Sequence, residues 1–439
     1  MLATATERSP TNSIVDHAVA RLDAWLETMR GARGYGGPVT HWRQQSLIYT
    51  GPGRDWRYEG IIAGYLELWR RSGAQIWLDR ARRAGDDLLG GQQANGHFAA
   101  SAFESNPAIA GSPHEAACDV GLLLLARALS QVGDSSWQIY AGCAEQNLRG
   151  YYISQLWDAN AGSFREHQRL SSFVANKAAT VCEALFLMSE LRGEDVWGEH
   201  YALPTLNAIL GHQVTDDGPL EGAIAQNSYS GRPVETYYPL FIARCIPALL
   251  QGYERTGVER YLDGAARAMA FIERWVGDSG ALPLIIRGDE QISPEPHLVA
   301  PLGDVLRAAD LLAAYGVHVD LGEMRRRLLD GQDASGGICL AAEPTGARRT
   351  RRSAPDFRDA LHVAGWCDKA FRYLAAHTGP ALPSARSETV ISECVIAGWR
   401  VELEESAEAL EVRHQGKLRY RWRKGHPWAE VAEKEFWRR

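Results

Sequence analysis

A glycine-containing turn phrase recurs along this chain at nearly even spacing, and this repeat constrains the fold more than any other feature. Five phrases end at glycines roughly 60 residues apart, and a sixth, GARGYG, precedes them at 31–36. The five glycines are Gly96, Gly162, Gly218, Gly280 and Gly336. Each phrase follows an amphipathic stretch, and Asn, Asp and Gly favour the left-handed conformations that end helices. The repeat therefore predicts a series of helical hairpins.

A second series of helices lies between these turns. Its members are rich in Ala, Leu and Gly and apolar on most faces, so we expect them to be buried on both sides. The first series, such as 74–89, has one apolar stripe and should face water. Several inner helices start at proline, which the first helical turn favours. The predicted starts are Arg57, Pro113, Phe173, Pro233, Pro296 and Pro355.

Six inner helices wrapped by six outer helices describe an all-α fold, an (α/α)6 barrel, over residues 1–380. Connections from outer to inner helices are long and all fall at one end, where long loops commonly carry function. The pattern changes in residues 381–439, where polar and apolar residues alternate over 399–404, 408–414 and 417–422. That alternation predicts a small three-stranded sheet packed on the barrel.

The chain resembles the superfamily of (α/α)6 toroids, which includes six-hairpin glycosidases, polysaccharide lyases, sugar epimerases, and terpenoid cyclases with protein prenyltransferases. Residues 58–89 and 176–197 and the phrase YLDGAARAM are similar to the carbohydrate branch, whereas QQANGHF resembles the cyclase branch. The cyclase motifs D-x-D-D and D-D-x-x-D are missing from the sequence. The resemblance implies an enzyme that acts on a carbohydrate; an isoprenoid enzyme and a non-catalytic binding barrel are the alternatives.

Charge and cysteine content limit the partners. The formal net charge is −7, which gives no electrostatic case for nucleic acid. The seven cysteines are widely spaced without a C-x-x-C, so we expect free thiols, no zinc site and no cofactor. No signal peptide is visible and the longest apolar run is too short to span a bilayer, so the expected location is the cytoplasm. The oligomeric state is left open.

All six inner helices should start at the long-loop end, so their positive dipole ends and first-turn side chains converge on one funnel. An acidic saccharide is the expected ligand. Glycoside hydrolysis needs a carboxylic acid and a carboxylate on opposite sides of the scissile bond. Glu59 with Asp359 is the first candidate pair, followed by Glu115 and Glu235.

A lyase or epimerase that acts on a uronate uses other groups, namely a Tyr, His or Lys that takes a proton and an Arg, Asn or His that neutralises the carboxylate. The candidate catalytic residues are therefore Glu59, Asp359, Glu235, Tyr237, His297 and Lys177. The candidate substrate-binding residues are Trp42, Trp56, Arg57, Tyr58, His114, Glu115, Asn176, Tyr238, Arg358 and His362. We expect Glu59, Glu235, Lys177 and His297 to share one hydrated funnel, so that alanine at these positions changes stability by less than about 1 kcal/mol.

Overall fold

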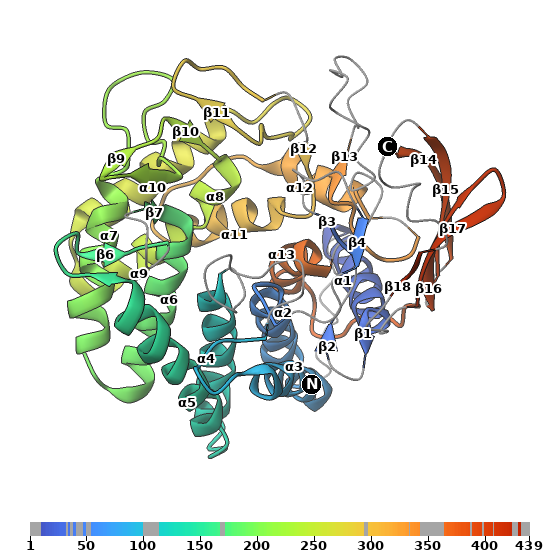
Figure 1. Ribbon diagram of the computed structural model, residues 1–439, viewed down its shortest axis with the longest axis horizontal. Coiled ribbons are helices and arrows are strands. Elements are labelled where there is room, and N and C mark those ends of the chain that lie inside the picture. The colour runs from blue at the N-terminus through green and yellow to red at the C-terminus, as the bar shows by residue number, and fades with distance from the viewer. Residues whose placement is uncertain are drawn as a thin grey trace, which may run out of the picture.

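The computed structural model describes residues 10–31, 34–35, 38–40, 47–49, 54–99, 114–166, 172–293, 297–332, 334–342, 364–386, 389–396, 399–406, 408–423 and 429–431. Within this part of the chain, inner and outer helices alternate along the sequence (Figure 1). The (α/α)6 barrel predicted from the repeat is confirmed.

The inner helices form a closed ring. They are α2 (Arg57–Ser72), α4 (Glu115–Gln131), α6 (Ala175–Arg192), α8 (Pro239–Ala243) with α9 (Ile246–Thr256), α11 (Leu302–Ala313) and α13 (Ala364–Ala375). Each packs against the next, and α13 packs against α2 to close the ring. Closure is what gives the barrel an interior that all six inner helices share.

The outer helices wrap this ring. They are α1 (Pro10–Thr28), α3 (Gln75–Gly91), α5 (Trp137–Asn147) with the π-helical turn Leu148–Leu156, α7 (Leu203–Leu210) preceded by the π-helical turn Trp197–Ala202, α10 (Glu259–Arg274) and α12 (Gly322–Asp330). The helix α10 shows the expected pattern, with Tyr261, Ala265, Ala268 and Ile272 buried along one face.

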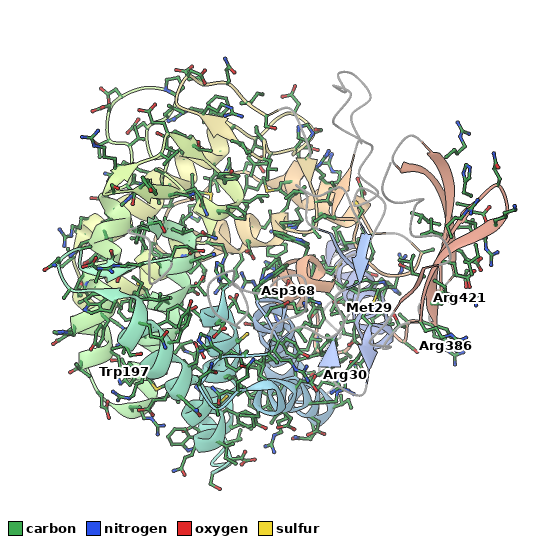
Figure 2. The ribbon with its side chains drawn as sticks, viewed as in Figure 1. Met29, Arg30, Trp197, Asp368, Arg386 and Arg421 are labelled. Carbon is green, nitrogen blue, oxygen red and sulfur yellow. The ribbon has the colours of Figure 1, made fainter. Side chains whose placement is uncertain are left out.

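Glycines permit the close approach of helices where the ring closes. A Cβ on Gly60 would lie 2.1 Å from the Asp368 carboxylate, and a Cβ on Gly64 would lie 2.4 Å from the Phe371 ring. These two glycines are one turn apart on α2 and face α13, so the helix backbones approach each other directly. Asp368 lies inside the ring (Figure 2) and accepts a hydrogen bond from the Gly60 N–H at 3.1 Å.

Long connections carrying short antiparallel strand pairs stand at one end of the barrel, and short turns stand at the other. The strands on the long connections are β1 (Arg30–Gly31), β2 (Gly34–Tyr35), β3 (Pro38–Thr40), β4 (Leu47–Tyr49), β5 (Trp157–Asp158), β6 (Ser163–Phe164), β7 (Ser172–Val174), β8 (Asn227–Tyr229), β9 (Arg232–Pro233), β10 (Thr236–Tyr237), β11 (Ile286–Arg287), β12 (His297–Leu298) and β13 (Ala341–Ala342). We call the long-loop end the mouth.

Two predicted helix starts were wrong. Pro233 lies in strand β9, and the fourth inner helix begins at Pro239 instead. The fifth begins at Leu302, directly after Pro301, whereas Pro296 lies outside the described residues, as does the predicted sixth start at Pro355. The preference of helix starts for proline did hold, but at the next proline along the chain. Short strands, β10 and β12, lie between each predicted start and the observed one.

The fourth inner helix is broken between α8 and α9, at Arg244 and Cys245. Pro247 stands at the start of α9 and has no N–H to donate to the carbonyl of Ala243, four residues earlier. At the break, the Arg244 N–H donates instead to Phe241 O at 3.2 Å and the Cys245 N–H to Ile242 O at 2.9 Å. The break places the Arg244 side chain in the middle of the barrel.

The C-terminal segment forms a five-stranded antiparallel meander of β14 (Val390–Ile396), β15 (Trp399–Glu405), β16 (Ala409–His414), β17 (Lys417–Arg423) and β18 (Ala429–Val431). The three predicted strands correspond to β15, β16 and β17, so the expected strand number was too small. The alternation test missed β14, VISECVI, because its apolar residues do not alternate strictly. In Figure 1 the sheet stands at one side of the ring, beyond α1.

Candidate functional site

A cluster of buried ion pairs crosses the middle of the barrel. Glu59 of α2 receives two parallel hydrogen bonds from Arg244, at 3.0 Å to each carboxylate oxygen, and is also bound by Arg372 of α13. Arg372 donates in addition to Asp304 of α11 at 2.5 Å. Lys369 Nζ lies 3.8 Å from Glu59 Oε2. We call these five residues the Glu59 cluster.

The surrounding cations decide the charge of its two carboxylates. Burial alone would raise the pKa of Glu59, but the positive charges of Arg244, Arg372 and Lys369 lower it well below its usual range. Asp304 follows the same pattern, because Arg372 and Arg244 outweigh its burial and lower its pKa. Both carboxylates are therefore ionised at neutral pH, and neither is a proton donor.

A cavity of about 240 Å³ lies above this cluster, on the mouth side. Its floor is formed by Glu59, Arg244, Asp304 and Lys369, and its walls include His114, Asn176, Lys177 and Gln226. Five of these residues stand at the N-terminal ends of inner helices, as predicted: Glu59, His114, Asn176, Lys177 and Asp304. We call it the mouth cavity. Three basic side chains and two ionised carboxylates place charges in its described lining, beside the apolar side chains of Leu240, Phe241 and Pro301.

Two tryptophans form an aromatic edge of the mouth cavity. The rings of Trp56 and Trp366 lie 5.0 Å apart, centroid to centroid, and are tilted by 56°. Lys369 Nζ lies 5.2 Å from the centroid of the Trp56 ring, within cation–π range. Phe241 lines the cavity as well and stacks on Tyr238, with 5.3 Å between ring centroids. An aromatic edge beside charged donors suits the apolar face of a sugar ring.

His114 stands immediately before α4 in a left-handed backbone conformation, with φ of 68° and ψ of 38°. A residue other than glycine in this region is held there by its surroundings. Next to it, Glu115 accepts hydrogen bonds from Asn147 at 2.6 Å and contacts His97 Nδ1 at 2.9 Å. The Ala116 N–H donates to Tyr152 Oη at 2.8 Å. These contacts fix the start of α4 and hence the His114 side chain.

The hydrogen bonds around His114 define which ring nitrogen is basic. Gln226 donates to Asn176 Oδ1 at 2.7 Å, so the Asn176 NH₂ group faces His114 Nε2, 3.5 Å away. A donor amide opposite Nε2 leaves that nitrogen as the acceptor. Burial, with the positive charges of Lys177 and Arg244, lowers the pKa of His114 well below its usual range. His114 is therefore neutral at neutral pH, and the Asn176 contact favours the tautomer with its lone pair on Nε2, while Nδ1 is buried without a hydrogen bond among the described residues.

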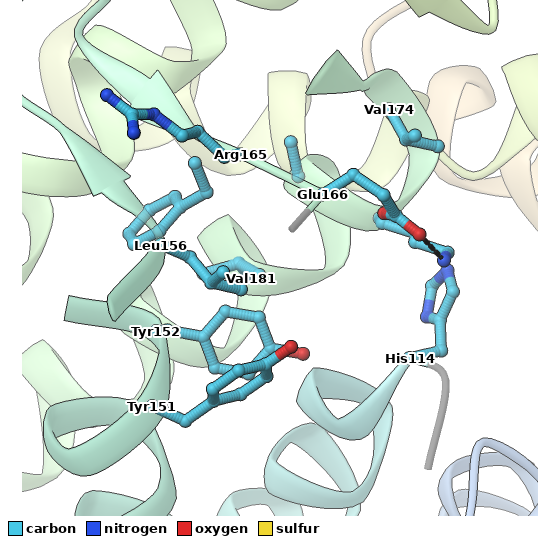
Figure 3. Close-up of a pocket in the computed structure, with 11 residues that line it drawn as sticks. His114, Tyr151, Tyr152, Leu156, Arg165, Glu166, Val174 and Val181 are labelled. Carbon is cyan, nitrogen blue, oxygen red and sulfur yellow. Dashed lines mark hydrogen bonds and ion pairs between the residues drawn. The ribbon is translucent and has the colours of Figure 1, made fainter. Parts of the chain in front are cut away.

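A side pocket of about 30 Å³ adjoins His114 (Figure 3), enough space for a water molecule. Tyr151 and Tyr152 line it from one side, and Glu166 reaches toward His114 from the other. Glu166 accepts a hydrogen bond from Lys177, which lines both this pocket and the mouth cavity. His114 thus lies between a polar side pocket and the main cavity.

Five of the predicted site residues line the mouth cavity: Trp56, Glu59, His114, Asn176 and Lys177. Four lie outside the described residues: Trp42, Arg358, Asp359 and His362. The remaining seven are described but do not line this cavity.

Three of these seven point into the protein instead. Arg57 is fully buried against Asp55, with hydrogen bonds of 2.7 and 2.9 Å, and the Tyr58 hydroxyl lies 3.3 Å from Asp87 of outer helix α3. Glu115 is held by His97 and Asn147. Residues 57, 58 and 59 point in different directions because successive helical residues are 100° apart, and only Glu59 faces the barrel axis.

The other four lie on the connections before α8 and α11. Tyr237 is buried in β10, 6.2 Å from the Phe271 ring, and Tyr238 stacks on Phe241. Glu235 is exposed, and His297 lies in strand β12. The expected common funnel therefore holds Glu59 and Lys177 but not Glu235 and His297. Both were expected in first helical turns, but the fourth and fifth inner helices begin later in the chain, at Pro239 and Leu302.

Four residues of the mouth cavity were not among the candidates predicted from the sequence: Arg244, Trp366, Lys369 and Gln226. One signal was available for Arg244: an arginine inside an otherwise apolar run, PLFIARCIPALL, needs a buried partner, and the proline three residues later breaks the helix there. Lys369 and Trp366 lie in an amphipathic helix whose inward face the sequence did not identify.

The described residues contain no group of three or more His, Cys, Asp or Glu arranged to hold a metal ion. Six cysteines in the described part of the chain are free thiols: Cys118, Cys143, Cys182, Cys245, Cys339 and Cys367. No helix in the described part of the chain is both long and apolar enough to cross a membrane.

Comparison with known proteins supports the fold. No protein-family model matches the chain, and no curated protein matches its sequence. Solved structures do match. Cellobiose 2-epimerase from Bacillus thermoamylovorans B4167 has a TM-score of 0.61 at 12% identity, over 82% of this chain and 99% of that one. A D-mannose isomerase has a TM-score of 0.57 at 13% identity, over 85% and 99%. An unsaturated glucuronyl hydrolase specific for heparin has a TM-score of 0.55 at 13% identity, over 83% and 95%. The chain thus has the (α/α)6 toroid fold of these proteins.

Proposed function

We propose that this protein is a carbohydrate-active enzyme that transfers a proton at a sugar carbon next to a carbonyl group, as an epimerase or isomerase does. The observation that carries the proposal is a neutral histidine, His114, beside the cationic groups of one polar cavity. A histidine that is neutral at neutral pH has a lone pair available for a substrate proton, and nearby cations stabilise the oxyanion that forms. The solved structures named above include an isomerase and an epimerase.

In the proposed reaction His114 Nε2 takes the proton from the carbon beside the carbonyl. The electron pair of the broken C–H bond forms a C=C bond, and the carbonyl oxygen becomes an enediolate oxyanion. Arg244 and Lys369, on the cavity floor, are the groups that would face this charge. Return of a proton to the opposite face of the same carbon gives an epimer. Return to the former carbonyl carbon, with the proton of the adjacent hydroxyl group passing to the enediolate oxyanion so that a new carbonyl forms, gives an isomer.

The preference for an acidic saccharide is part of the same proposal. Lys177 lines the mouth cavity above a floor that already contains Arg244 and Lys369, so a substrate carboxylate would meet cations. If the substrate is a uronate and His114 removes the proton beside its carboxylate, the reaction would be that of a lyase. The charged side chains of the described lining favour a sugar, whose hydroxyl and carboxylate oxygens can pair with them, over an isoprenoid.

Glycoside hydrolysis is the second candidate, supported by the likeness to the glucuronyl hydrolase fold. It requires a protonated carboxyl group, and the two carboxylates of the described lining, Glu59 and Asp304, have lowered pKa values. A hydrolase would therefore depend on a carboxyl group other than these two, such as Asp359, which lies outside the described residues. The proposed location in the cytoplasm rests on the sequence alone.

The proposal is tested by incubating the protein in D₂O with a panel of aldoses, ketoses, disaccharides and uronate-containing oligosaccharides. We expect deuterium to enter the substrate at the carbon beside the carbonyl, and His114→Asn to slow this exchange about 10²–10⁴-fold. His318→Asn, an exposed histidine far along the chain, is the matched control and should leave the rate unchanged. New reducing ends without exchange would show a hydrolase instead, and an unsaturated absorbing product would show a lyase.

A further inference from the structure

A second cavity, of about 460 Å³, lies at the opposite end of the barrel from the mouth. Its outer rim is formed near the C-terminal ends of inner helices, at Arg70, Gln131 and Glu190, where the short turns begin. Its inner end reaches Glu59 and Arg372, so the Glu59 cluster separates the two cavities. We call it the basal cavity. Nothing in the proposed reaction uses it.

The charges at the rim of the basal cavity neutralise one another. Arg70 bonds Glu67 at 2.6 Å and Arg127 bonds Glu190 at 3.3 Å. His377 Nε2 lies 3.0 Å from Asp310 Oδ2. Each of these three basic side chains therefore has a carboxylate within hydrogen-bond distance and does not require an added ligand.

Arg307 of α11 is different. It lines the same cavity with 30% of its side chain exposed, and its nearest carboxylate oxygen, of Glu183, is 4.0 Å away. Among the described residues its guanidinium donates no hydrogen bond. Burial lowers its pKa, and so do the positive charges of Arg372 and Arg244. The negative charge of Glu59 is already engaged by those two arginines, so it compensates Arg307 little.

Glu183 does not complete the compensation. Burial and the neighbouring charge of Glu59 raise its pKa, and its Oε1 atom lies 3.7 Å from Arg244. Its Oε1 atom is buried without a hydrogen bond, and so is the amide oxygen of Gln251 nearby in the cavity lining. The helix dipole does not supply a counter-charge at Arg307 either, because this residue lies six residues before the end of α11 and the effect is confined to the last turn.

We propose that the basal cavity binds a small oxyanion, such as sulfate, phosphate or a carboxylate, on the guanidinium of Arg307. A planar guanidinium with free N–H groups matches two oxygens of such an anion. The site is independent of the proposed sugar reaction, and it touches the mouth cavity only through Glu59.

Isothermal titration calorimetry with sodium sulfate, at constant ionic strength maintained with sodium chloride and without any sugar, tests the site directly. Sulfate stays divalent above pH 3, so its own titration does not confuse the result. We expect saturable binding of one sulfate to the wild type and at least tenfold weaker binding to Arg307→Gln. Arg127→Gln, which removes a rim arginine of the same cavity, should bind as the wild type does within about threefold.

Lys177→Gln locates the anion, because it removes a cation of the mouth cavity and leaves the basal cavity intact. Retained sulfate binding in this variant together with loss in Arg307→Gln supports the proposal. Loss in Lys177→Gln with retention in Arg307→Gln would place the anion in the mouth cavity and overturn it, as would the absence of saturable binding to a folded wild type. Circular dichroism of each variant identifies loss of binding that comes from misfolding. None of these measurements depends on enzymatic activity.

Discussion

Two buried carboxyl groups near the starts of neighbouring inner helices differ sharply in their surroundings. Glu59 of α2 is bound by Arg244 and Arg372, which reach it from two other helices, and its pKa is lowered. Asp119 of α4 has neither carboxylate oxygen hydrogen-bonded, and burial with the charge of Glu115 raises its pKa well above the usual range. Burial is nearly equal for both, so the partners from other helices decide which group is charged.

The largest effect is expected for Glu59→Ala. Removing this carboxylate takes both hydrogen bonds to Glu59 from the buried Arg244 and leaves Arg372 with Asp304 as its carboxylate partner, and breaking a buried pair costs about 3–5 kcal/mol. The free energy of unfolding, measured with urea, should fall by that amount. This result differs from the small change expected from the sequence, because the sequence did not reveal the arginine partners.

Glu67→Ala is the matched control for that measurement, since Glu67 lies two turns further along α2 and pairs with the exposed Arg70. An exposed pair contributes no more than about 1 kcal/mol, so this variant should remain close to the wild type. If both variants lose equally little stability, Glu59 is not the centre of a buried ion cluster.

Asp119→Asn tests the other half of the comparison. Because the pKa of Asp119 is raised on folding, the folded state retains a proton that the unfolded state releases above about pH 4. Wild-type stability should therefore fall as the pH rises from there toward the folded-state pKa, with Asp119 contributing up to about 1.4 kcal/mol per pH unit. Asparagine carries no such proton, so the variant should lack this component of the slope.

The slope is measured by urea denaturation of both proteins between pH 4 and pH 8, with the exposed Asp263→Asn as control. The difference in stability between Asp119→Asn and the wild type should increase in favour of the variant with rising pH. A difference that stays constant across this range would mean that Asp119 is already ionised in the folded protein.

Lys177→Met has the smallest expected effect on stability, below about 1 kcal/mol, because its pair with Glu166 is about one-third exposed. The main effect of this substitution is the loss of a positive charge beside His114. The positive charge of Lys177 lowers the pKa of His114, so its removal raises that pKa. If neutral His114 is the base, the acid limb of the pH–activity profile moves to higher pH in Lys177→Met. Lys177→Arg, which keeps the charge, should leave that limb near its wild-type position.

The sequence predicted the parts of this molecule that depend on periodicity. Turn phrases roughly 60 residues apart are sufficient to predict that inner and outer helices alternate and that the long loops lie at one end of the barrel. They also placed Glu59, His114, Asn176 and Lys177 near the helix starts that form the cavity. Proline positions were less reliable, since Pro233 occurs in a strand and the helix starts at Pro239. The predicted start at Pro233 put Glu235 in the first turn of an inner helix, whereas Glu235 lies on the connection before α8 and does not line the cavity.

What the sequence could not predict depends on contacts between distant helices. The partners of Glu59 are 185 and 313 positions away along the chain. The direction of a side chain within a helical turn depends on where the helix begins, so Arg57 and Tyr58 could not be distinguished from Glu59 in advance. The domain boundary at residue 380 and the roles of the site residues remain predictions.

The central claim is that His114 is held neutral in the mouth cavity with its lone pair on Nε2. Nitrogen NMR of ¹⁵N-histidine-labelled protein, with His114→Asn used to assign the signal, measures both the pKa and the protonated nitrogen. We predict a pKa well below 6.5 and a proton on Nδ1 throughout the neutral range. A His114 that titrates at or above 6.5, or carries its proton on Nε2, would contradict the account.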